Sequence, residues 1–97
     1  MTAHRDRSGE AQPQAAALRY EAGTDRAPRV VAKGRGALAE EIVRRARESG
    51  VPIHESRELV AALMQFEVDQ QIPAALYLAV AEVLAWVYQL EARALNP

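Results

Sequence analysis

The sequence predicts a single α/β domain, in which a small three-stranded mixed sheet in the order β-β-α-β-α-α packs against helices. Short aliphatic runs bounded by glycine and proline, at residues 29–33 and 51–55, are typical of buried strands. Apolar side chains recur with a helical period at residues 37–49 and 74–92, between and after these runs. A chain of 97 residues has room for one modest core, so one domain is expected.

The first part of the chain changes character near residue 15. Residues 1–14 are polar and have no apolar period, so we predict a disordered N-terminal tail and a domain that covers residues 15–97. A first strand is predicted over residues 15–20, although its alanines favour a strand only weakly. A loop that contains Gly23 and Pro28 follows it.

The middle of the chain predicts a βαβ unit. Two glycines separate the strand at residues 29–33 from the helix at residues 37–49, and Gly50 ends that helix before the strand at residues 51–55. Strands that a helix joins in this way run parallel, so the strand at residues 15–20 is left at an edge of the sheet or opens it.

Two further helices are predicted in the second half. Ser56 is a suitable N-terminal cap for a helix that turns Leu59 and Leu63 inward. The last helix, at residues 74–92, follows Pro73. Its apolar stripe consists of Leu76, Val80, Val83, Leu84 and Val87. Leu78 points nearly opposite this stripe, so it is expected to be exposed unless a partner covers it.

The residues do not predict catalytic chemistry. Cysteine is absent, which excludes disulfides, thiol nucleophiles and cysteine-based zinc sites. His54 precedes Glu55, but consecutive strand residues point to opposite faces, so the pair is not aligned to act as a base and its orienting group. A pocket in which both side chains converge would favour an enzyme instead. Gly34 and Gly36 lack the spacing of a phosphate-binding loop. We predict no enzyme, no catalytic residue, no metal site and no cofactor.

The charge pattern argues against nucleic acid as a partner. Residues 1–50 carry 10 basic and 7 acidic side chains, and residues 51–97 carry 2 and 6, so neither half is strongly basic. No apolar run approaches the ~20 residues of a membrane helix, because Glu82 and Gln89 interrupt the longest one. We therefore predict no direct membrane span.

Three stretches are specific when taken together. Residues 30–34 read Val-Val-Ala-Lys-Gly, and residues 50–53 read Gly-Val-Pro-Ile. Residues 72–88 read Ile-Pro-Ala-Ala-Leu-Tyr-Leu-Ala-Val-Ala-Glu-Val-Leu-Ala-Trp-Val-Tyr. In this order and spacing they resemble the C-terminal cytoplasmic domain of the flagellar and type III secretion export-switch family, FlhB/YscU. The resemblance extends over roughly residues 15–91.

The resemblance implies a non-catalytic interaction module of the flagellar or type III protein export apparatus. Members of the family sit at the cytoplasmic mouth of the export gate and take part in switching export from early to late substrates. The chain would substitute for, or modulate, the C-terminal domain of a full-length FlhB. Its implied partners are the N-terminal half of such a protein and other export components. Its implied location is the cytoplasm, peripheral at the inner-membrane gate.

The family cleaves itself at Asn-Pro-Thr-His, and the sequence departs from that motif. The four corresponding positions hold Glu10, Ala11, Gln12 and Pro13. The cleavage requires an asparagine amide, so we predict no autocleavage. The family also places a strand before this site. Residues 1–14 offer no apolar counterpart, so we expect an unpaired edge at residues 15–20 that accepts the upstream strand of a full-length member.

The partner-binding surface is predicted from the positions of four basic side chains that flank strand ends and the loop near the family's cleavage region: Arg19, Arg29, Lys33 and Arg35. An alternative stays open, in which the chain is a self-associating regulatory or adaptor domain unrelated to flagellar export. Leu78 and Trp86 would then lie on the face of a weak homodimer.

Overall fold

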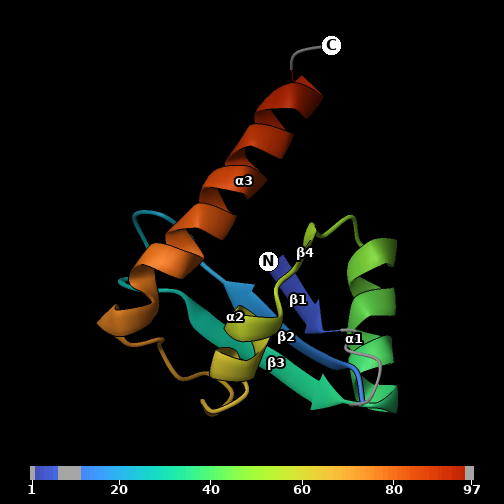
Figure 1. Cartoon of the computed structure of the whole chain (residues 1–97). Helices are drawn as coiled ribbons and strands as arrows, with labels where there is room; N and C mark the ends of the chain where they lie inside the picture. The colour runs from blue at the N-terminus through green and yellow to red at the C-terminus, as the bar shows by residue number, and fades with distance from the viewer. Residues whose placement is uncertain (1, 7–11, 96–97) are drawn as a thin grey trace.

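The computed structural model describes residues 2–6 and 12–95, and it contains one mixed sheet with helices on both faces (Figure 1). The elements in chain order are β1 (Thr2–Asp6), β2 (Gln14–Arg19), β3 (Arg29–Arg35), α1 (Ala37–Glu48), β4 (Ile53–Glu55), α2 (Arg57–Leu63), the 3₁₀ helix η1 (Ala74–Leu76) and α3 (Tyr77–Leu95). The α/β class and the order β-β-α-β-α-α are thus confirmed for residues 14–95, with a fourth strand in front.

The fourth strand is the main difference from the sequence-based expectation. Thr2–Asp6, part of the predicted disordered tail, form β1, and Gln14 already belongs to β2. The strand order is β3-β2-β1-β4, so β1 is an interior strand that runs antiparallel to β2 and parallel to β4. Strand pairing uses backbone groups, so a polar sequence with neighbours on both sides can pair without an apolar period. Residues 1 and 7–11 of the predicted tail lie outside the described residues.

The predicted open edge at β2 is therefore wrong. β1 pairs with one side of β2 and β3 with the other, and the pairing with β3 shifts register between Ala17 and Leu18. Because β1 and β3 are both antiparallel to β2, β3 and β4 run in the same direction, as the predicted βαβ unit requires. They are not adjacent, since β2 and β1 lie between them.

The two faces of the sheet are covered by different helices. On one face, Ala16, Leu18 and Val30 pack with side chains of α2 and α3 in the larger core cluster. On the other face, Ala15 packs with Ala39 and Val43 of α1. Ala15–Leu18 are all buried, as expected for an interior strand with helices on both sides.

Helix ends follow the local sequence. The Ser56 hydroxyl accepts a hydrogen bond from the Leu59 N–H (3.2 Å), which confirms the predicted cap of α2. Gly36, with φ 60°, precedes α1, and Gly50, with φ 71°, follows it. Pro73 precedes η1 rather than the α-helix itself, and α3 begins at Tyr77.

Helix α3 extends beyond the sheet toward the C-terminus (Figure 1). Contrary to the expectation from the sequence, Ala74–Arg93 is long and apolar enough to cross a membrane by length and composition. One such helix is weak evidence for a membrane span, because a core helix of a soluble protein passes the same test. Here α3 supplies Val80 and Val83 to the core, and only 17% of the segment is buried, so most of its surface is open to other contacts.

Candidate docking groove

An apolar groove of about 380 Å³ lies between the β2–β3 loop and α3. Its lining residues come from two segments that are far apart in the sequence: Tyr20, Arg26, Ala27 and Pro28 from the loop side, and Tyr77, Val80, Ala81, Leu84, Ala85 and Tyr88 from α3. Its volume lies near the lower end of the range that small-ligand pockets span.

The α3 wall of the groove follows from helical spacing. Tyr77, Ala81, Leu84 and Tyr88 recur at intervals of three and four residues, which places them on one face of the helix. Val80 is buried beneath this face. The small side chain of Ala81 leaves a hollow between the two tyrosines, which are about half exposed, at 46% for Tyr77 and 51% for Tyr88.

The opposite wall is a loop held in place by its own hydrogen bonds. The Asp25 carboxylate accepts a hydrogen bond from the Glu21 N–H (2.8 Å), and the Glu21 carbonyl accepts from the Thr24 and Asp25 N–H groups. The Pro28 carbonyl accepts from the Ile72 N–H (3.0 Å), which fastens the loop to the segment before α3. Ala27 and Pro28 are buried as a result, so this wall is formed before any ligand arrives.

The electrostatic character of the groove is simple. Arg26 is exposed, and it is the only charged side chain among the described residues that line the site. The tyrosine hydroxyls add donors and acceptors. The lining offers no thiol, no hydroxyl beside a base and no carboxylate pair, so the arrangement suits binding of an apolar segment better than catalysis.

The four basic residues predicted from the sequence do not gather on one surface. Arg19 and Arg29 are backbone register partners at one end of the β2–β3 ladder, whereas Lys33 and Arg35 lie toward the other end of β3. Arg29 and Arg35 are six residue steps apart along β3, which is roughly 20 Å at the usual rise per residue. Because strand faces alternate and the register shifts, the two pairs also point to opposite faces.

Three of these four side chains have contacts within the chain. Arg19 lies 3.5 Å from the Glu21 carboxylate, and Arg29 lies 4.0 Å from Asp25. The Lys33 ammonium donates to the Met64 carbonyl just after α2 (3.1 Å), which satisfies a free C-terminal carbonyl of that helix. Arg35 is exposed at the end of β3. Their roles in binding a partner remain predictions.

His54 and Trp86 link the sheet edge to the last helix. The two rings lie 5.6 Å apart, edge to face, with an interplanar angle of 70°. Trp86 is therefore half-buried against β4, whereas Leu78 is 76% exposed, as predicted. The dimer face proposed in the self-association alternative thus loses much of Trp86 and keeps Leu78. Within the described residues, no group of three or more histidine, cysteine or acidic side chains is placed to hold a metal ion.

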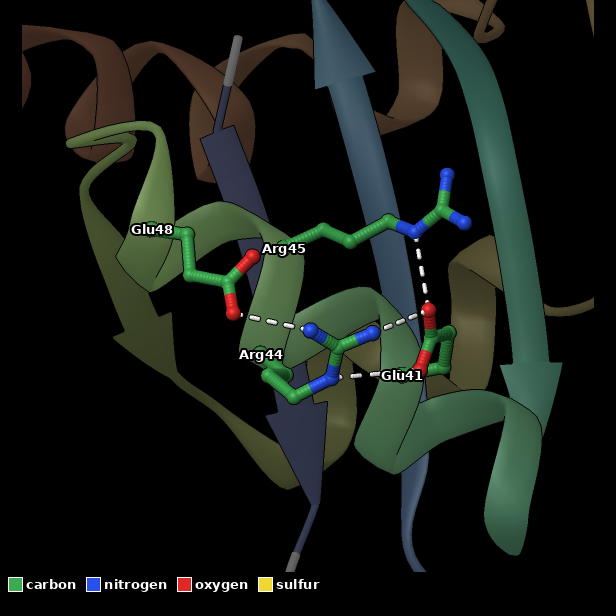
Figure 2. Close-up of polar contacts among 4 residues, drawn as sticks. All are labelled: Glu41, Arg44, Arg45 and Glu48. Carbon is green, nitrogen blue, oxygen red and sulfur yellow. Dashed lines mark hydrogen bonds and ion pairs between the residues drawn. The ribbon is translucent and has the colours of Figure 1, made fainter.

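A network of charges covers the exposed face of α1 (Figure 2). One Glu41 oxygen accepts hydrogen bonds from both Arg44 and Arg45, and Arg44 also donates to Glu48 (2.8 Å). Arg44 therefore joins two glutamates, Glu41 and Glu48, across successive turns of the helix. Exposed ion pairs of this kind each contribute little to the free energy of unfolding. We therefore interpret the network as the solvated outer face of α1.

We expect the Glu41 carboxyl to titrate far below its usual range. Hydrogen bonds from Arg44, and then from Arg45, lower its pKa from 4.5 to about 2. Because the folded pKa lies below the unfolded value, the stabilising contribution is complete above pH 4.5 and is lost as the pH falls toward 2. NMR titration of the side-chain carbon should show this pKa, and Arg44→Gln should raise it. An unchanged value in Arg44→Gln would contradict the assignment.

Sequence reasoning missed the groove itself. The sequence predicts only a core stripe on the last helix and a loop that contains Gly23 and Pro28. The available signal was the alternation of tyrosine and alanine along one face of α3, since small residues between exposed aromatics leave a hollow. The loop wall carries no comparable signal, because Ala27 and Pro28 reach α3 only through the fold.

Comparison with known proteins places these features in context. The model of the FlhB HrpN YscU SpaS family matches residues 13–87. The chain is 46% identical over 78 residues to the uncharacterized protein YlqH of Bacillus subtilis, covering 80% of this chain and 84% of that protein. It is 50% identical over 76 residues to the flagellar biosynthetic protein FlhB of Escherichia coli, covering 77% of this chain and 20% of that protein.

Solved structures resemble the fold as well. The cytoplasmic domain of FlhB from Shewanella putrefaciens matches with a TM-score of 0.82 and 34% identity, over 93% of this chain and 70% of that one. The PscU C-terminal domain matches with a TM-score of 0.70 and 41% identity, over 74% of this chain and 92% of that one. The chain spans about a fifth of the length of the FlhB proteins that it matches.

Proposed function

Because this chain belongs to the FlhB HrpN YscU SpaS family of export-apparatus proteins, we propose that it is a non-catalytic docking domain that substitutes for, or modulates, the C-terminal domain of a full-length FlhB. In this role it takes part in the change from early to late export substrates. It acts in the cytoplasm, at the mouth of the export gate, beside the N-terminal half of a full-length relative.

The groove between the β2–β3 loop and α3 is the observation that carries this proposal. It is preformed and mostly apolar, and its lining includes three tyrosines and one exposed arginine. Such a site binds a short apolar segment of another export protein, with the tyrosine hydroxyls and Arg26 meeting polar groups at its ends.

The proposal predicts that a charge in the groove abolishes docking while a neighbouring charge does not. Ala81→Glu places a carboxylate in the hollow, where it would be desolvated by an apolar ligand. Ala79→Glu is the matched control, because Ala79 is exposed on the same helix outside the groove. We expect Ala81→Glu to lower the amount of secreted hook protein at least tenfold and Ala79→Glu to change it little.

The measurement uses an E. coli strain whose FlhB lacks its C-terminal domain. Supplying this chain in trans should restore secretion of hook protein, and Ala81→Glu should not, with circular dichroism confirming that both variants fold. No rescue by the unmodified chain would refute the substitution role. Equal rescue by both variants would refute the groove. Hook length and flagellin secretion in the rescued strain report on the change of substrate class.

We also propose that the chain does not cut itself, because the position of the family's asparagine holds Glu10. A glutamate side chain has no amide nitrogen to attack its own carbonyl. Electrospray mass spectrometry after prolonged incubation should return the intact mass. Fragments that end near residue 10 would overturn this prediction.

The basic residues Arg19, Arg29, Lys33 and Arg35 stay proposed partner contacts of the second rank. Arg35 is the most suitable of them for a test, because it is exposed. The alternative of a self-associating domain is favoured by one observation, the 76% exposure of Leu78. The molar mass from light scattering at high protein concentration distinguishes the docking role from the self-association alternative. The alternative requires the mass of a dimer, and the docking role does not.

A further inference from the structure

The outer edge of β3 is covered over only part of its length. β3 is an edge strand, because β2 is its only strand neighbour in the described sheet. The segment before α3 bonds to the start of this edge, where the Val30 N–H donates to the Gln70 carbonyl (3.2 Å) and the Val30 carbonyl accepts from the Asp69 N–H (2.6 Å). No other described segment forms backbone hydrogen bonds with this edge at residues 31–35. An edge of this kind can pair with a further strand.

On the α1 face of the sheet, the surface beside this edge is apolar. Ala32 lines a pocket of about 330 Å³ together with side chains of α1. Ala17 and Ala32 form the sheet side of this pocket, and their small side chains leave the space beneath α1 unfilled. Leu38 lies over Gly34 on the same face and is itself exposed. An apolar side chain that lies beside β3 on this face can therefore be buried against α1.

On the opposite face, the surface beside the same edge is basic. Lys33 points to this face, because its ammonium donates to the Met64 carbonyl just after α2 (3.1 Å). Arg35 lies two residues further along β3, so it is on the same face, and it is exposed. An acidic side chain in a strand beside β3 would lie next to both cations.

We infer that the β3 edge at residues 31–35 is a second docking site, which takes an extended segment of another protein with alternating apolar and acidic residues. Side chains of a strand alternate between faces, so the apolar ones would lie beside Ala32 and Leu38. The acidic ones would lie beside Lys33 and Arg35. The backbone ladder supplies affinity, and the two faces select the sequence. The inference rests on the proposed docking function and adds a recognition rule to it.

The charges of β3 disfavour a second copy of this chain as the occupant. Edge-to-edge pairing of two β3 strands would bring Lys33 and Arg35 of one copy beside the same cations of the other. Lysine at a sheet edge commonly prevents such self-association. The same cations attract carboxylates, so they favour an acidic segment over a copy. None of the residues at 31–35 lines the groove beside α3, so the two sites can fail separately.

The first test measures binding of a fluorescein-labelled peptide, Val-Glu-Ile-Glu-Val, to the unmodified chain by fluorescence anisotropy. The control peptide, Val-Lys-Ile-Lys-Val, reverses its charge. Arg35→Glu reverses one cation of the edge, and Arg47→Glu is the matched control, because Arg47 is exposed on a different side of α1. We expect the acidic peptide to bind at least tenfold more tightly than the basic one. Arg35→Glu should weaken its binding at least tenfold, and Arg47→Glu less than twofold, with circular dichroism confirming that both variants fold.

Equal weakening by Arg35→Glu and Arg47→Glu would overturn the inference, since it would indicate attraction to net charge alone. Ala81→Glu, in the groove, should leave the affinity for the acidic peptide unchanged. Absence of peptide binding by a chain that still restores secretion of hook protein would reject the edge site and keep the proposed function. A dimer of the unmodified chain that Arg35→Glu changes in stability would overturn the choice of occupant.

The second test asks whether the peptide joins the sheet through its backbone. Only one edge of an added strand faces β3, so N-methylation of either the apolar residues or the two glutamates should abolish binding, and N-methylation of the other set should change it less than threefold. Hydrogen exchange should show that the acidic peptide protects amides at residues 31–35 and leaves those of β4 unchanged. Equal binding of the two methylated peptides, or protection of β4 in place of β3, would contradict strand addition at this edge.

Discussion

Replacing Leu63 with alanine should lower the free energy of unfolding by about 3 kcal/mol. Leu63 is the last residue of α2 and is fully buried in the larger core cluster, where it joins the sheet to α3. Its truncation removes apolar contacts within this cluster and leaves a cavity in the core. A loss of this size is a large part of the stability of a small domain.

Urea denaturation followed by far-ultraviolet circular dichroism measures this loss. For a domain of this size each kcal/mol corresponds to roughly 4–8 °C in Tm, so the melting temperature should also fall by more than 10 °C. Leu38→Ala is the matched control, because Leu38 is 55% exposed on α1. We expect less than about 1 kcal/mol for this control. Similar losses in both variants would mean that Leu63 does not lie in the core.

Gly34→Val is the second large effect, expected at about 2 kcal/mol. A Cβ atom at Gly34 would overlap Leu38, because it would lie 2.9 Å from the Leu38 Cβ atom and closer still to its Cγ atom. Leu38 belongs to the first turn of α1, which the hydrogen bond from Gly36 N–H to the Pro13 carbonyl fixes against the sheet (2.8 Å). Rotation of the Leu38 side chain cannot relieve the contact with its Cβ atom, so the helix must move away from β3.

A double-mutant cycle tests that explanation. Leu38→Ala removes the Cγ and Cδ atoms that clash, so Gly34→Val should cost less in the Leu38→Ala background than in the natural chain. Denaturation midpoints of the four proteins give the coupling. Strict additivity of the two changes would show that the cost of Gly34→Val arises elsewhere in the sheet.

The elements with an apolar period could be predicted from the sequence. The strand at residues 29–33, the helix at residues 37–49 and the last helix appear close to their predicted bounds, because burial of one face determines both their sequence and their structure. The cap at Ser56 was also readable, since a side-chain hydroxyl at a helix start has a local cause.

What the sequence could not show depends on contacts between distant segments. β1 was missed because its pairing uses backbone groups, which every residue has, and its polar side chains indicated a tail. The groove was missed because Ala27 and Tyr77 are fifty residues apart and meet only in the fold. The sequence places the basic residues near strand ends, but the register shift between β2 and β3 decides the face of the sheet on which each one lies.

The contact between His54 and Trp86 makes Trp86 an intrinsic fluorescence probe of the sheet edge. Trp86 is the single tryptophan of the sequence, and its ring rests on β4. The only strand neighbour of β4 in the described sheet is β1. Release of β1 from the sheet would loosen β4 and with it the His54 ring that Trp86 contacts. The intrinsic fluorescence of Trp86 would then report whether β1 is paired, without an added dye, in purified protein or in a stopped-flow experiment.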